Sequence, residues 1–375
     1  MINQEKLIEA FRRQGVEFFT GVPDSFLNGF CTCLTSAAPP ERHVITANEG
    51  NAVAMAAGYY LATGRVPLVY MQNSGMGNAV NPILSLTDKQ VYSIPMVFLI
   101  GWRGQSGTGD HDHHAAQGRL TLTLLDDMEI PYRILSDNDA DASADAAWSV
   151  QTARESSLPA ALVVPKGVCT GEKKPFENET YPLSREDAIR IVIEHSPPDA
   201  ACVATTGRAT RELYAVRTEN GAYAARDFLN VGAMGHAVSV AQGLALADKS
   251  RPVICFDGDA AAIMHMGSLT MASKLDVPNL LHIVLNNGAH ESVGGQPSAG
   301  HLIDFTGIAA GCGYETAGKA VETQRELCGA IERLSNRTRA GFIDVKIRKG
   351  IRKGLPSIDI STLELKKKIM FEYSK

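Results

Sequence analysis

The polar residues with the clearest chemical potential follow an apolar run at 252–256. Asp257, Gly258 and Asp259 come directly after this run, and small residues typical of a helix follow them. In open α/β sheets, ligands bind where a strand ends and a helix begins. The N-terminus of a helix attracts anions, yet two carboxylates stand here. We therefore expect a cation between these carboxylates and an anionic ligand.

A second pair of oxygen donors, Asn286 and Asn287, lies 27 and 28 residues after Asp259. The interval holds an expected helix at 261–275 and an expected strand at 280–286. It is long enough to carry the chain from the end of one strand to the end of the next parallel strand. Carboxylate and amide oxygens suit Mg²⁺, which also binds phosphate groups of a ligand. The spacing thus predicts a magnesium site at one edge of a sheet.

Short apolar runs alternate with helix-length segments along the chain. This alternation predicts an α/β protein with parallel sheets covered by helices on both faces. The expected strands are 66–72, 94–101, 160–165, 201–207, 252–258, 280–286 and 341–347. The segment 167–185 is rich in Gly, Pro and charge and breaks the pattern. We predict a first domain over 1–170, a linker over 171–186 and a second domain over 187–375.

The chain also contains an internal similarity at an offset of 185 residues. The segment 52–67 aligns without a gap on 237–252, and seven of the sixteen positions are identical. An apolar strand follows in both copies, which favours one architecture used twice. The alternative is that two Ala-rich helices resemble each other by composition. At this offset Glu49 falls on Met234 and Ser74 falls on Asp259, so the two copies would contribute different parts of one site.

The composition indicates an ordinary globular protein. The net charge is −5 and no apolar run approaches the length of a membrane span, so we expect no nucleic-acid or membrane partner. The segment 1–19 has the pattern of an amphipathic helix rather than of a signal peptide. The seven cysteines are scattered, which predicts free thiols in a reducing compartment and a cytoplasmic protein.

The combination of Gly258-Asp259-Ala260 with Asn286-Asn287 resembles the GDG…NN signature of thiamine-diphosphate-dependent enzymes, with Ala260 in place of the last glycine. The resemblance implies two thiamine-diphosphate-binding-fold domains, each a parallel sheet flanked by helices. The first would bind the pyrimidine and the second the diphosphate. Thiamine diphosphate and Mg²⁺ are the implied cofactors. The implied metal ligands are Asp259, Asn287 and the carbonyl of Ala289, and Gly258, Ala260 and Ala261 would adjoin the cofactor.

The same resemblance assigns a role to Glu49, which precedes an Ala-rich helix. In the family, a glutamate in this context hydrogen-bonds the aminopyrimidine and promotes activation of the cofactor. Taken alone, Glu49 could equally be a carboxylate that stabilises a helix start. Met234 matches the apolar residue that bends the cofactor, and the carbonyl of Gly232 matches the acceptor for its amino group. A core methionine is the alternative for Met234.

Family members build each site from two subunits. The resemblance therefore implies a homo-oligomer in which Glu49 of one copy faces Met234 and Asp259 of another. The expected substrate is a small anionic 2-oxo acid. The stretches that carry this expectation are 21–27, 72–86, 101–110, 205–213 and 286–297.

These stretches are similar to the decarboxylases that convert 3-phosphonopyruvate to phosphonoacetaldehyde and CO₂ in phosphonate biosynthesis. Decarboxylation of sulfopyruvate is the first alternative. A non-catalytic thiamine-binding subunit and an acetolactate-type carboligase are further alternatives.

The substrate pocket needs cations and hydrogen-bond donors for a carboxylate and a phosphonate. We expect Ser25, His113 and His114 to be catalytic. A zinc site is the alternative for the clustered histidines. The further substrate candidates are Asp24, Arg103, His111 and Arg208. For Arg103 and Arg208 the alternative is a salt bridge at the surface. Acetaldehyde-forming relatives have a glutamate six residues after the second asparagine, where this chain has Val293, so the proton donor must be another group.

Overall fold

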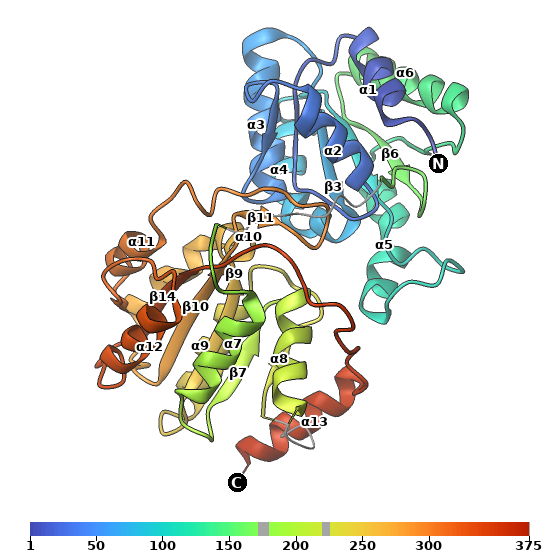
Figure 1. The fold of residues 1–375 in the computed structure, drawn as a ribbon. Coiled ribbons are helices and arrows are strands. Elements are labelled where there is room, and N and C mark those ends of the chain that lie inside the picture. The colour runs from blue at the N-terminus through green and yellow to red at the C-terminus, as the bar shows by residue number, and fades with distance from the viewer. Residues whose placement is uncertain (172–179, 220–225, 375) are drawn as a thin grey trace. The chain divides into compact units, whose positions relative to one another are not determined.

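The computed structural model describes residues 1–171, 180–219 and 226–374, and these form two compact units (Figure 1). The first comprises Met1–Lys174 with Val293–Gln296, and the second comprises Pro175–Ser292 with Pro297–Lys375. Half of the expected linker, residues 172–179, lies outside the described residues. Residues 293–296 belong to the first unit although the sequence analysis placed them in the second domain.

The first unit is a six-stranded parallel sheet with the strand order β2-β1-β3-β4-β6-β5. Helices cover both of its faces (Figure 1). Its elements are α1 (Gln4–Arg13), β1 (Phe19–Gly21), α2 (Asn28–Ala37), β2 (His43–Ile45), α3 (Glu49–Thr63), β3 (Leu68–Gln72), the 3₁₀ helix η1 (Asn73–Gly75), α4 (Met76–Thr87), β4 (Val97–Gly101), α5 (Asp112–Asp127), β5 (Tyr132–Ile134), α6 (Asp139–Ser156) and β6 (Ala160–Val164).

The second unit repeats this topology, since its strand order β8-β7-β9-β10-β14-β13 corresponds strand for strand to that of the first. Its elements are α7 (Arg185–Glu194), β7 (Ala201–Ala204), α8 (Arg208–Thr218), β8 (Phe228–Leu229), α9 (Ala237–Ala247), β9 (Val253–Gly258), α10 (Asp259–Met264), the 3₁₀ helix η2 (Met266–Ser273), β10 (Leu280–Asn286), β11 (Ala289–His290), β12 (Gln296–Pro297, at the unit boundary), α11 (Phe305–Gly311), β13 (Glu315–Thr316), α12 (Gln324–Arg333), β14 (Gly341–Lys346) and α13 (Thr362–Tyr373).

Both faces of each sheet are buried, which explains why the strands are continuously apolar. On β3, Leu68 and Tyr70 join the core beneath α1, α2 and α6, whereas Val69 and Met71 join the core beneath α3, α4 and α5. This is the two-residue alternation of a strand. The predicted fold class, two parallel sheets flanked by helices, is therefore confirmed.

The seven expected strands are all present, but the sequence missed seven short ones among the described residues: β1, β2, β5, β8, β11, β12 and β13. Each of these has only two or three residues, too few for an apolar run to stand out. The expected helix at 261–275 was also wrong, because α10 ends at Met264 and the 3₁₀ helix η2 follows. Thr270 and Ser273 bond back to carbonyls three residues earlier, which competes with α-helical bonding.

No helix among the described residues combines the length and the apolar character required to cross a membrane. Each of the seven cysteines is an unpaired thiol, and Cys31, Cys169, Cys202 and Cys255 are buried.

Candidate functional site

The residues singled out from the sequence lie at the carboxyl ends of strands in each unit. In both sheets the chain reverses its direction of winding between the first and third strands of the unit, β1 and β3 or β7 and β9. Open α/β sheets bind their ligands at such switch points, outside the carboxyl ends of the strands.

In the second unit, Asp259 and Asn287 are neighbours because the strands before them are neighbours. Strands β9 and β10 are parallel and pair Gly258 with Leu285. Asp259 therefore begins α10 beside the end of β10, and its carboxylate accepts a hydrogen bond from the backbone N–H of Asn287. Burial raises the pKa of Asp259 to about 6, although hydrogen bonds from Ser298 and Asn287 act in the opposite direction.

The donor atoms at these strand ends fit a hard cation. Asp259 is 2% exposed and Asn287 is 4% exposed, so both oxygens sit in a protected place. The side-chain oxygen of Asn287 accepts from the N–H of Ala289 at 3.0 Å, which brings the residue of the third expected ligand to the same turn. Carboxylate, amide and backbone carbonyl oxygens are ligands of Mg²⁺. The residues present thus fit the magnesium ion that the sequence predicts.

A glycine-rich segment covers this group of oxygens. Ser298 donates to the carboxylate of Asp259. A Cβ atom on Gly300 would lie 2.5 Å from Oδ2 of Asp259 and 2.6 Å from Oδ1 of Asn286, so only glycine fits there. The amide of Asn286 is held by the carbonyl of Gly300 at 2.7 Å and by Asp344 at 3.1 Å. Asn286 therefore supports the site from the core.

Asp257, the other carboxylate of the motif, faces the core. It is fully buried, accepts from the N–H of Gly258 at 3.0 Å and lies 3.5 Å from Nε2 of His282. The small residues beside Asp259 occupy the start of α10: Gly258 is extended, and Ala260 and Ala261 are buried in its first turn. Ala260 has no positive φ, so its methyl group is tolerated where the motif has glycine.

The segment before α9 has an unusual backbone. Ala233, between Gly232 and Met234, has a φ of 45°, which is rare for a residue with a Cβ. The N–H of Gly232 donates to the side chain of Asn230 at 3.2 Å, and this bond helps to hold the turn. Met234 is only partly buried. It is therefore not a fully enclosed core methionine, and its cofactor role stays a prediction.

In the first unit, Glu49 is the first residue of α3 and is 5% exposed. Its Oε2 accepts from Nδ2 of Asn78 at 2.8 Å. Burial raises the pKa of the Glu49 carboxyl, and the bond from Asn78 opposes this only in part. A Cβ atom on Gly75 would lie 2.2 Å from Oε1, so the glycine makes room for the carboxyl group. Glu49 is thus a buried carboxyl group at a helix start, and its role in activating the cofactor stays a prediction.

Asp24, Ser25 and Arg103 lie together after β1 and β4. Nη1 of Arg103 donates to Oγ of Ser25 at 2.9 Å, and Nε and Nη2 form a bidentate pair with Asp110 at 2.7 and 2.6 Å. This pair lowers the pKa of Asp110. Asp24 is fully buried, one of its oxygens has no hydrogen-bond partner, and burial raises its pKa to about 6.

The three histidines gather at the start of α5. The rings of His111 and His113 stack with centroids 5.5 Å apart, and those of His113 and His114 are 4.1 Å apart. Burial, together with the charge of Arg103, lowers the pKa of His114 to about 4 and also lowers that of His113. Both rings are therefore neutral at pH 7. Within the described ranges these histidines do not form a group of three metal-ligating atoms, so the structure does not favour the zinc alternative.

Arg208, at the start of α8, lies in the second unit, whereas Arg103 lies in the first. Its Nη1 donates to Glu291 at 2.7 Å, and Glu291 in turn accepts from Nδ2 of Asn287 at 2.8 Å. Both expected arginines thus hold a carboxylate. Asn78, Ser298 and Glu291 are contacts of the expected site residues that sequence reasoning did not assign. Asn78 and Glu291 lie within the stretches 72–86 and 286–297 that the sequence analysis singled out, but the sequence does not show which residues they contact.

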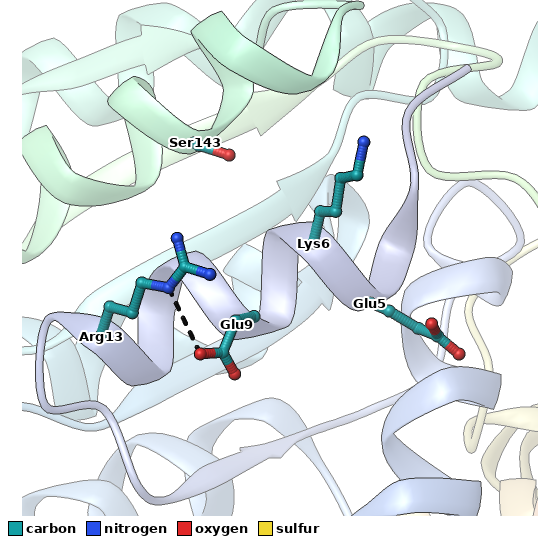
Figure 2. A pocket seen from close by; sticks show the side chains of 5 residues that line it. All are labelled: Glu5, Lys6, Glu9, Arg13 and Ser143. Atoms are coloured by element: carbon teal, nitrogen blue, oxygen red, sulfur yellow. Dashed lines mark hydrogen bonds and ion pairs between the residues drawn. The ribbon is translucent and has the colours of Figure 1, made fainter.

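A surface hollow between α1 and α6 of the first unit lies apart from the strand ends. Figure 2 shows its lining, which is Glu5, Lys6, Glu9, Arg13 and Ser143. Arg13 pairs with Glu9 at 3.3 Å on the exposed surface. Exposed ion pairs of this kind contribute little, and the hollow contains none of the site residues.

Comparisons with known proteins match both halves of the chain. Residues 3–130 match the N-terminal TPP binding domain of thiamine pyrophosphate enzymes, and residues 205–345 match the C-terminal TPP binding domain. A phosphonopyruvate decarboxylase of Streptomyces viridochromogenes is 34% identical over 84% of this chain and 81% of its own length. A phosphonopyruvate decarboxylase of Streptomyces hygroscopicus is 32% identical over 89% of this chain and 83% of its own length. A sulfopyruvate decarboxylase of Methanosarcina acetivorans is 27% identical over 97% of this chain and 96% of its own length.

Proposed function

The chain belongs to the thiamine pyrophosphate enzyme family, and from that premise we propose that it decarboxylates 3-phosphonopyruvate to phosphonoacetaldehyde and CO₂ with the aid of Mg²⁺. The observation that carries the choice of substrate is the 34% identity to a phosphonopyruvate decarboxylase over 84% of the chain. Thiamine diphosphate is its cofactor and carboxy-lyase is its enzyme class. A place in phosphonate biosynthesis stays a prediction.

When bound, thiamine diphosphate supplies the carbon nucleophile and the electron sink that a 2-oxo acid needs to lose CO₂. In our proposal Asp259, Asn287 and the carbonyl of Ala289 hold the Mg²⁺ that binds the diphosphate. The oxygen-only donor set and its burial support this assignment. Met234 and Gly232 would contact the rings of the cofactor.

Glu49 is the residue that we expect to exchange a proton with the pyrimidine. Its burial and its raised pKa support this role, because burial makes the carboxyl group hold a proton more firmly than an exposed glutamate does, as suits a group that takes up and returns a proton. Asn78 orients the carboxyl through Oε2, and Gly75 leaves space at Oε1.

The substrate brings a carboxylate and a phosphonate, so its pocket must offer N–H donors and positive charge. Arg103 offers positive charge there, because its guanidinium group donates to Ser25 and lies close enough to Asp24 to act on its charge. The neutral rings of His113 and His114 can donate a hydrogen bond or pass a proton without adding charge. These residues are our candidates for binding the anions and for returning the proton after CO₂ leaves.

Self-association is part of the proposal, and the duplicated helices α3 and α9 support it. Both leave the same positions exposed: Ala54 and Ser239, Gly58 and Gly243, Leu61 and Leu246, and Ala62 and Ala247. Leu61 is 70% exposed and Leu246 is 50% exposed. Exposed apolar side chains beside glycines suit close packing against another helix. We infer that these faces pair between copies, so that each site receives Glu49 from one copy and Asp259 from another.

The test is an assay of the purified chain with thiamine diphosphate and Mg²⁺ against phosphonopyruvate, sulfopyruvate and pyruvate, with CO₂ release as the readout. We expect turnover of phosphonopyruvate that stops when Mg²⁺ is chelated. Glu49→Gln should lower kcat by about 10²–10⁴-fold, the usual contribution of a proton-transferring group, and should still take up the cofactor by calorimetry. Equal turnover of sulfopyruvate would contradict the substrate assignment, and full activity of Glu49→Gln would contradict the role of Glu49.

Sulfopyruvate decarboxylation is the second candidate function. The relative with that activity aligns over 97% of this chain, more than the two phosphonopyruvate decarboxylases, although at lower identity. The two reactions differ only in the anionic group at C3. The same assay therefore distinguishes them.

A further inference from the structure

Glu291 is a buried carboxylate that touches a proposed metal ligand and is held from several directions. It lies just after β11 and is 6% exposed. Its Oε2 accepts from Nδ2 of Asn287 at 2.8 Å and from Nη1 of Arg185 at 3.1 Å. Its Oε1 accepts from Nη1 of Arg208 at 2.7 Å and from the N–H of Gly350 at 2.6 Å. Both oxygens are therefore fixed in place.

The contact with Asn287 has a consequence for the orientation of its amide. A side-chain amide presents an oxygen acceptor on one side and a nitrogen donor on the other. An ionised carboxylate can only accept, so it must face Nδ2 and not Oδ1. Oδ1 then faces the turn, where the N–H of Ala289 occupies one of its two lone pairs. The second lone pair remains for a cation.

We propose that Glu291 is a positioning residue that keeps the oxygen of Asn287, rather than its nitrogen, directed at the magnesium ion. The inference rests on the proposed magnesium site. Residues outside the ligand shell commonly orient the ligands in this way, and their loss weakens metal binding by about 10–100-fold. Glutamine in place of Glu291 could face either end of the amide, so only the N–H of Ala289 would still oppose the flipped orientation.

The ion network around Glu291 supplies a matched control. Arg185 is bound on its other side by Glu212, through Nε at 2.6 Å and Nη2 at 3.1 Å. Glu212 is as buried as Glu291 but is not a partner of Asn287 in the described structure. Glu212→Gln thus removes the same charge beside the same arginine and leaves the amide of Asn287 untouched.

The experiment measures binding of Mn²⁺, used as a probe for Mg²⁺, to the full chain in the presence of thiamine diphosphate, by the loss of the free Mn²⁺ EPR signal. We expect Glu291→Gln to bind Mn²⁺ about 10–100-fold more weakly than the unmodified chain, and Glu212→Gln to stay within about threefold. If Glu291→Gln does not fold, Glu291→Asp serves instead, because its charge remains but its shorter side chain withdraws from Asn287. Circular dichroism checks the fold of each variant.

A second background separates orientation from general stability. In Asn287→Asp the ligand has two equivalent oxygens and needs no orienting acceptor. Adding Glu291→Gln to that variant should leave Mn²⁺ affinity unchanged or raise it. Equal affinities of Glu291→Gln and Glu212→Gln, or the same loss in both backgrounds, would overturn the inference. No Mn²⁺ binding by the unmodified chain would instead contradict the proposed function.

Discussion

Asp24, Glu49 and Asp259 are buried carboxyl groups beside strand ends, and burial raises the pKa of each. Each keeps at least one hydrogen bond that favours its charged form, from Phe26, Asn78 and Ser298 respectively. Burying a carboxylate costs free energy, so such groups concentrate where their charge or their proton is used. At the scale of single residues, these three are the most strongly indicated functional groups.

The protonation of Asp24 predicts a measurable dependence of stability on pH. Its pKa rises from 3.8 to about 6 on folding, so the folded chain binds more protons than the unfolded chain between these values. The free energy of unfolding should therefore fall as the pH rises through this window, by about 3 kcal/mol in total. Asp24→Asn removes this contribution, and it can still accept the bond from Phe26.

Urea unfolding of both proteins from pH 4 to pH 7 checks this expectation. Relative to the unmodified chain, Asp24→Asn should gain about 2 kcal/mol between pH 4 and pH 7, the larger part of the total, because only the aspartate becomes charged. Other groups titrate alike in both proteins and cancel in the comparison. A stability difference that does not change with pH would contradict the raised pKa.

At the scale of elements, the path of the chain after a strand decides how close a backbone can come to a functional side chain. Gly75 ends the short helix η1 between β3 and α4 and lies against Glu49. Gly300 likewise lies directly against the carboxyl group of Asp259. In both cases the absence of a side chain provides the room for a buried carboxyl group.

Gly75→Ala should displace the Glu49 carboxyl, since the added Cβ would lie 2.2 Å from its Oε1. We expect kcat to fall by about 10²-fold while the fold persists, because displacement of about 1 Å in a catalytic group has effects of this size. Decarboxylation kinetics with circular dichroism check the result. The matched control is Gly77→Ala, two residues later in α4, where a Cβ meets nothing within 4 Å.

Gly77→Ala should keep its activity and gain about 0.5–1 kcal/mol of stability, as alanine does in a helix interior. If both variants lost activity equally, the loss would stem from the helix and not from the approach to Glu49.

At the scale of the whole molecule, the chain is one architecture used twice. Both units have the same strand order, and the aligned segments 52–67 and 237–252 fall in the corresponding helices α3 and α9. The two helices even expose corresponding positions. The copies differ at the strand ends, where the first presents Glu49 and the second presents Asp259. In our proposal these two residues contribute different parts of one site.

Leu61→Lys should weaken self-association, because it places a charge in the apolar face of α3. Sedimentation velocity over a range of protein concentrations should show a larger fraction of single chains. Activity should fall with dissociation and recover at high concentration. Leu363→Lys on α13 is the matched control, because Leu363 is 68% exposed and Leu61 is 70% exposed. An unchanged sedimentation profile for Leu61→Lys would contradict pairing through α3.

The sequence by itself determined the long central strands, because a strand buried on both faces must be continuously apolar. It also indicated that Asp259 and Asn287 would lie close together, since consecutive strands of a βαβ unit end at the same edge of a sheet. Both inferences need only local patterns and one rule of connection. The same reasoning could not supply the short edge strands, whose two or three residues carry no periodicity.

Only the tertiary structure decided which polar groups hold the expected site residues in place. Asn78 reaches Glu49 across 29 residues, Ser298 reaches Asp259 across 39, and Arg185 reaches Glu291 across 106. A hydrogen bond needs its two atoms within about 3 Å, and nothing in the spacing of such residues fixes that distance. It is fixed by the packing of helices on the sheet, which depends on the whole core at once.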